Sequence, residues 1–138
     1  MRIVLDTNVV VSGLLWSASP RHLLDAVRAG RASAFTSREL LEELADVLSR
    51  PHLVPLLTKQ QTSAAALVQG YALLATIVTS AEISATIIAD PDDDALIATA
   101  LAARADLIIS GDRKVLDLKH HHGIAIVNPA EAQRLLST

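Results

Sequence analysis

The chain has 138 residues, a net charge of −3 and no cysteine, and 51% of its residues are hydrophobic. This length fits a single domain, residues 1–138, with enough apolar side chains for a core, and the missing cysteines exclude disulfides and thiolate zinc sites. Because aromatic residues make up only 2% of the chain, platforms for base stacking are nearly absent. The negative net charge argues against a basic surface that clamps DNA through its phosphates.

No apolar run approaches the ~18 residues needed to cross a bilayer. The strand pattern begins directly after Met1, with no basic stretch, apolar signal core or cleavage site ahead of it. We therefore expect a soluble cytoplasmic protein that does not contact the membrane.

Short apolar runs alternate with helical patterns along the chain. Strands are expected at residues 2–5, 32–35, 77–78, 86–89, 107–109 and 124–127. Helices are expected over 9–16, from Pro20 behind a Ser19 cap to Gly30, from Thr36 to Ser49, from Thr58 to Leu74, from Asp90 to Arg104, and after Asn128-Pro129.

Each expected strand is a continuous apolar run, and no hairpin dipeptide joins two of them. That pattern predicts an α/β fold in which helices cover both faces of a central parallel sheet. Ligands of such sheets bind beyond the carboxyl ends of the strands. Asp6 and Asp112 both stand at such ends, after the runs 3–5 and 107–109.

Two further acids lie on or beside the apolar faces of expected helices. Glu43 is at the boundary of its helix face, and Asp93 shares a face with Ile97 and Leu101. Carboxylates gathered in one cleft repel each other unless protons or a hard cation such as Mg²⁺ or Mn²⁺ neutralise them. A cluster of Asp6, Glu43, Asp93 and Asp112 would therefore be a metal site.

Each acid taken alone has an ordinary structural interpretation. Asp6 and Asp112 could form turns, Glu43 could be a solvated helix residue, and the run 90–94 could cap a helix and offset its dipole. The neighbouring Asp94 also leaves the register of the third acid open. Only the combination of all four in one α/β pattern favours a site.

This combination resembles the PIN-domain nucleases, in particular the small bacterial group related to the VapC toxins of toxin-antitoxin pairs. The similarity covers nearly the whole chain. It is carried by Ile3-Val4-Leu5-Asp6-Thr7-Asn8 with Ser12-Gly13, by residues 37–44 with 47–51, by Asp90-Pro91-Asp92-Asp93 before Ala98-Thr99-Ala100, and by residues 105–112 ending in Ser110-Gly111-Asp112.

The resemblance implies a PIN-like three-layer sandwich and a metal-dependent endoribonuclease. It implies RNA as substrate, Mg²⁺ or Mn²⁺ as cofactor, an antitoxin protein as partner, and a homodimer. The implied metal-binding and catalytic residues are Asp6, Glu43, Asp93 and Asp112, with Asn8, Asp94 and Ser110 as supporting residues. Lys114 stands where many relatives carry a further acid, which leaves a second metal ion open.

Two other functions are compatible with the pattern. One is a metal-stabilised interaction module that no longer cuts RNA. The other is a phosphatase of the haloacid dehalogenase type, which is disfavoured because Asn8 replaces the second Asp of an Asp-x-Asp motif and no catalytic Lys stands out.

Three further segments have simpler interpretations. The run His120-His121-His122 is expected to be a solvated loop, because contiguous side chains cannot close a metal site. The apolar segments 9–16 and 53–57 are candidate protein interfaces.

Overall fold

The computed structural model describes residues 1–16, 18–79, 91–121 and 123–137, without the side chains of residues 91–94 and 121. In this part of the chain six strands form one sheet in the order β3-β2-β1-β4-β6-β5. All neighbouring pairs are parallel except β5 and β6. The strands are β1 (Arg2–Leu5), β2 (Ser33–Thr36), β3 (Thr76–Ile77), β4 (Leu107–Ile109), β5 (His120–His121) and β6 (Ile124–Val127).

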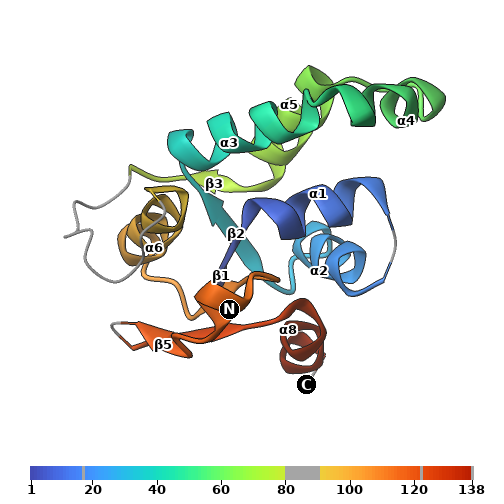
Figure 1. Cartoon of the computed structure of the whole chain (residues 1–138). Helices are drawn as coiled ribbons and strands as arrows, with labels where there is room; N and C mark the ends of the chain where they lie inside the picture. Colours follow the sequence, from blue (N-terminus) through green and yellow to red (C-terminus); the bar gives the residue numbers. More distant parts are fainter. Residues whose placement is uncertain (17, 80–90, 122, 138) are drawn as a thin grey trace.

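Helices cover both faces of this sheet, which confirms the predicted α/β architecture. In Figure 1, α6 lies on one side of the strands and α1, α2 and α8 lie on the other, while α3, α4 and α5 extend beyond β3. The helices are α1 (Thr7–Leu15), α2 (Ser19–Arg28), α3 (Arg38–Leu48), η1 (Pro51–Leu53), α4 (Val54–Lys59), α5 (Ala64–Leu74), α6 (Pro91–Ala103), α7 (Arg113–Leu116) and α8 (Pro129–Leu136).

The central strands divide their side chains between two hydrophobic clusters. Ile3 and Leu5 pack with α1, α2 and α3 on one face, whereas Val4 packs with α6 on the other. The same alternation places Ile109 in the first cluster and Ile108 in the second, because successive side chains of a strand point to opposite faces. Burial on both faces explains why these strands are continuous apolar runs.

Glycine at position 13 allows α1 and α2 to approach closely. A Cβ atom at Gly13 would lie 2.8 Å from Leu24 Cδ1 and 2.8 Å from the carbonyl oxygen of Pro20. These contacts are too short for a methyl group, so the glycine is explained by packing within the chain.

Three predicted helix starts were wrong by a few residues. Ser37, rather than Thr36, caps α3, with its hydroxyl accepting from the Leu40 amide. Ser63 caps α5, whereas Thr58 lies inside α4. The cap of α2 is Ala18, so Ser19 is already helical. In the first two cases a second hydroxyl residue near the predicted one has the extended backbone that a cap requires.

The histidine run differs from the predicted loop. His120 and His121 form β5, which pairs antiparallel with Ile124 and Ala125 of β6. Gly123 lies between the two strands with a φ of +80°, a conformation that glycine adopts without strain. The expected strand at residues 86–89 lies outside the described residues.

None of the helices in the described residues has both the length and the apolar character needed to span a membrane.

Candidate active site at the carboxyl ends of the strands

Asp6 is fixed at the carboxyl end of β1 by hydrogen bonds on both sides. Its backbone amide donates to the Ile109 carbonyl at 2.9 Å, and its carboxylate Oδ1 accepts from the Thr7 amide at 2.8 Å. Asp6 is also the N-cap of α1 and is only 8% exposed. A carboxylate beside the first amides of a helix interacts favourably with the helix dipole, so the local fold holds this acid in one orientation.

Ser110 joins the ends of β1 and β4. It is fully buried, and its hydroxyl donates to Asp6 Oδ2 at 2.7 Å while accepting from the Asp112 amide at 3.0 Å. This arrangement follows from the parallel pairing of β1 with β4, in which Leu5 lies opposite Ile109. The hydroxyl of Ser110, which was predicted as a polar support, therefore links two acids that are 106 positions apart in the sequence.

Asp112 is the N-cap of α7 and is half-buried at the same edge of the sheet. Its Oδ1 accepts from the Lys114 amide at 2.9 Å. No lysine or arginine in the described residues forms an ion pair with it. Lys114 thus helps to position Asp112 through its backbone amide.

Asn8 is exposed near the start of α1, where its side chain and Asp112 line a shared hollow. The structure therefore brings three of the predicted residues, Asp6, Ser110 and Asp112, into one hydrogen-bonded group and places Asn8 beside it.

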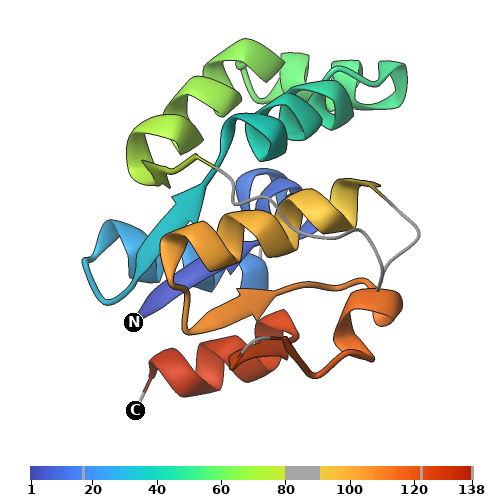
Figure 2. The same cartoon turned by 90° about the vertical axis from the view of Figure 1, so that its left-hand side faces the viewer.

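Glu43 lines a different, strongly acidic hollow along α3. The hollow has a volume of about 380 Å³. Its wall includes Ala95 of α6, the residue directly after Asp94. Figure 2 shows α6 crossing the face of the sheet below α3 and α5. The lining residues are Glu39, Glu42, Glu43, Asp46, Val47, Arg50 and Ala95.

Asp93 and Asp94 lie in the first turn of α6, and their side chains are outside the described residues. The grouping of all four predicted acids, and the choice between Asp93 and Asp94, therefore stay predictions. A buried hydrogen bond of 2.7 Å between the Thr99 and Ser37 hydroxyls ties α6 to the start of α3. This contact anchors the two helices that carry Glu43 and Asp93.

The donor set suits a hard divalent cation. Carboxylate oxygens are the ligands that Mg²⁺ and Mn²⁺ prefer, and the carboxylates of Asp6 and Asp112 are oriented by hydrogen bonds. Within the described side chains, no three Asp, Glu or His residues gather closely enough to form a metal site. These side chains fit part of such a site, with Asp93 still to be placed.

The fold and this edge of the sheet define an α/β domain that presents acids at the carboxyl ends of parallel strands. A model of the PIN domain matches residues 2–114. The chain therefore belongs to the PIN domain family, as the sequence pattern predicted.

A solved structure has the same fold over almost its whole length. It is a chain of the crystal structure of VapBC2 from Rickettsia felis bound to a DNA fragment from their promoter. The TM-score is 0.63 at 17% sequence identity, over 93% of this chain and 98% of that chain. Such low identity establishes the shared fold alone. No curated protein matches the sequence.

Proposed function

We propose that the chain is a divalent-metal-dependent endoribonuclease that acts as the toxin of a toxin-antitoxin pair. The observation that carries this proposal is the hydrogen-bonded group of Asp6, Ser110 and Asp112 at the carboxyl edge of a PIN-domain sheet. PIN domains are generally nucleases. The fold shared with the VapBC2 chain supports the assignment to a toxin-antitoxin pair.

In the proposed mechanism some residues bind the metal ion and others orient the residues that bind it. Asp6, Asp93 and Asp112 would hold the ion, and Glu43 would complete its shell or orient the attacking water. Ser110 keeps Asp6 fixed by donating to Oδ2, and the Lys114 amide does the same for Asp112. A bound Mg²⁺ or Mn²⁺ would neutralise charge on the phosphate and supply an activated water.

The phosphates of an RNA substrate can be bound by a few separate arginine side chains rather than by a continuous basic surface. Arg113 follows Asp112 directly and is exposed, and Arg50 lines the hollow of Glu43. Arg38 is already paired with Glu42 at 2.9 Å, with both side chains largely exposed. A small number of arginines beside the acids is consistent with substrate binding that depends mainly on the metal ion.

The direct test is incubation of the purified protein with assorted RNAs in Mg²⁺, in Mn²⁺ and in chelator, beside the variant Asp6→Asn. Asparagine retains an acceptor for the Thr7 amide, so the helix cap is preserved. We expect cleavage that disappears both with chelator and in the variant. Cleavage that survives both would overturn the mechanism, and phosphate release from simple monoesters without RNA cleavage would favour a phosphatase.

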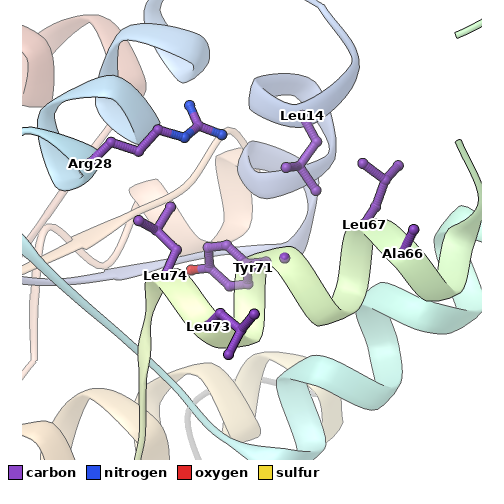
Figure 3. A pocket seen from close by; sticks show the side chains of 8 residues that line it. Leu14, Arg28, Ala66, Leu67, Tyr71, Leu73 and Leu74 are labelled. Carbon is purple, nitrogen blue, oxygen red and sulfur yellow. The ribbon is translucent and has the colours of Figure 1, made fainter.

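An apolar groove between α1, α2 and α5 supports an antitoxin as partner. Figure 3 shows Leu14 of α1 facing Leu67, Tyr71 and Leu74 of α5, with Arg28 at the rim. The groove has a volume of about 460 Å³, and Leu73 at its edge is 82% exposed. We propose that an antitoxin helix fills it with apolar side chains and places an acid beside Arg28, which is paired with Asp25 at 3.0 Å and half-exposed.

Complex formation with the antitoxin proposed as partner tests the groove. Leu67→Asp should abolish co-purification while RNA cleavage continues, because a buried carboxylate would face apolar side chains. An unchanged complex would exclude this groove as the docking site.

The segments predicted as interfaces are mostly used inside the chain. Val9, Val10 and Leu15 are buried in the core, as are Leu53 and Leu57. The large hydrophobic side chains of these segments that are exposed are Trp16, at 50%, and Val54, at 51%.

We propose self-association through the exposed residues Trp16 and Val54, tested by sedimentation across micromolar concentrations. A mass of one chain at every concentration would contradict the homodimer.

A further inference from the structure

A small hollow lies directly beside the acids at the carboxyl edge of the sheet. Its volume is about 250 Å³, below the roughly 300–1,000 Å³ of sites that enclose drug-sized ligands. It can hold one small unit of a polymer. The residues that line it are Asn8, Val9, Ser12, Pro20, Gly111, Asp112 and Pro129.

The chemistry of the lining disfavours two parts of a nucleotide. It contains no lysine or arginine, and its single charged residue, Asp112, is assigned to the metal ion in the proposed mechanism, so no side chain of the lining would bind a phosphate group by itself. It contains no aromatic side chain, so a base would find no stacking platform. The remaining polar groups are the carboxamide of Asn8 and the hydroxyl of Ser12, which suit an uncharged polar unit.

Asn8 and Ser12 are well placed to bind one ligand together. They are four residues apart on α1, so they lie on the same face of the helix. In the described part of the chain neither side chain has a hydrogen-bond partner. A hydroxyl and a carboxamide can each donate and accept, and the ribose 2′-hydroxyl, which distinguishes RNA from DNA, also does both.

Gly111 has no explanation within the chain itself. Unlike Gly30 and Gly123, it does not have a positive φ. Unlike at Gly13, a Cβ there would have no atom of the described residues within 4 Å, apart from its two chain neighbours. It is exposed and lies between Ser110 and Asp112 at the hollow. Gly70 in α5 also lacks both features, but Gly111 lies at the wall of the hollow, where the missing Cβ leaves room for a ligand.

We propose that this hollow is a ribose subsite, which binds the sugar of the nucleotide next to the scissile phosphate and makes the protein prefer RNA to DNA. Asn8 and Ser12 bind the 2′-hydroxyl, and Gly111 leaves room for the sugar. This inference rests on the proposed function, because the scissile phosphate is placed by the acids of that site.

The test compares binding of two labelled single strands of the same sequence, one an oligoribonucleotide and one an oligodeoxyribonucleotide. Fluorescence anisotropy with Ca²⁺ in place of Mg²⁺ gives the ratio of the two dissociation constants without relying on cleavage. The variants are Asn8→Ala, Ser12→Ala, Gly111→Ala and Gly111→Val. Ser137→Ala, at the opposite end of α8 from Pro129, is the matched control.

We expect the wild-type protein to bind RNA more tightly than DNA. Loss of one hydrogen bond in Asn8→Ala or Ser12→Ala should reduce this ratio by roughly three- to tenfold, while Ser137→Ala leaves it unchanged. The Gly111 variants should weaken RNA binding in order of side-chain size, with an unchanged melting temperature.

Equal binding of RNA and DNA by the wild-type protein would overturn the subsite, as would an unchanged ratio in both Asn8→Ala and Ser12→Ala. Failure of the proposed function gives a different result. In that case no RNA is cleaved in Mg²⁺ or Mn²⁺, yet the preference for RNA and its loss in the variants persist.

Discussion

The two sides of the candidate site are built in different ways. On the sheet side, Asp6 and Asp112 are held by the ends of adjacent parallel strands and by one buried hydroxyl of Ser110. On the helix side, Glu43 depends on the rotation of α3 and lies in a hollow lined by three further acids. The comparison indicates that hydrogen bonds between strand ends preform the sheet side, whereas the placement of Glu43 follows from that of α3.

The largest expected effect comes from the sheet side. Asp112→Asn keeps an acceptor for the Lys114 amide and hence the cap of α7 but removes a negative charge from the proposed metal site. Cleavage of RNA should fall by roughly 100-fold or more, since substitutions of residues that merely support metal ligands cost about 10–100-fold. Initial rates with Mg²⁺ check this, beside a melting curve close to that of the wild type. A wild-type rate would remove Asp112 from the mechanism.

A smaller effect is expected on the helix side. Glu43→Gln should slow cleavage by about 10–100-fold, the range found when a group that orients a metal ligand or its water is removed. The matched control is Glu42→Gln, because Glu42 lines the same hollow but is paired with Arg38. Equal loss in the two variants would mean that α3 contributes a general negative potential rather than a specific acid.

Ser110→Ala tests the link between the two strand ends. The change leaves Asp6 Oδ2 and the Asp112 amide without their shared partner in a buried setting, which should lower the free energy of unfolding by about 1–3 kcal/mol. Activity should fall by roughly tenfold. Denaturant unfolding and initial rates measure the two effects. A loss of stability with unchanged activity would show that Ser110 supports the fold but not the acids.

The smallest effect at neutral pH is expected far from the acids, at Tyr71. Its hydroxyl is buried and has no hydrogen-bond partner in the described part of the chain, and burial raises its pKa above the ordinary value. Tyr71→Phe should therefore leave cleavage unchanged and alter the free energy of unfolding by less than about 1 kcal/mol near pH 7.

The burial of the Tyr71 hydroxyl also predicts how the free energy of unfolding depends on pH. Above pH ~10 the tyrosine of the unfolded chain ionises while the buried one does not, so unfolding releases a proton and stability falls as the pH rises. The stability that the un-ionised hydroxyl of Tyr71 contributes is complete below pH ~10. It is lost progressively as the pH rises toward the raised pKa of the folded state. Chemical denaturation between pH 8 and 11 should show a steeper decline in the wild type than in Tyr71→Phe. Parallel declines would contradict the buried, unionised state of this hydroxyl.

The sheet side of the site could be predicted from the sequence because it depends on local patterns. The apolar runs before Asp6 and Asp112 identify two buried strands, and the carboxyl ends of parallel strands share one edge. The link through Ser110 could not be predicted in detail, because the pairing of β1 with β4 is a property of the strand order. Continuous apolar strands carry no alternation that would reveal which face each side chain takes.

Other features were missed for identifiable physical reasons. The pairing of β5 with β6 involves only two residues of each strand, and polar histidines do not produce a strand pattern. The start of α3 was placed one residue early because Thr36 and Ser37 are both good caps, and the extension of β2 through Thr36 decides between them. The four-residue helix α7 is too short to show a helical period.

The central claim is that Asp6 takes part in binding a divalent cation at the end of β1. Calorimetric titration of Mn²⁺ into the wild-type protein, Asp6→Asn and the control Glu42→Gln tests it most directly. Binding in the wild type and the control that is weakened at least about tenfold in Asp6→Asn is the predicted result. Identical Mn²⁺ affinity in all three proteins, each folded, would contradict it.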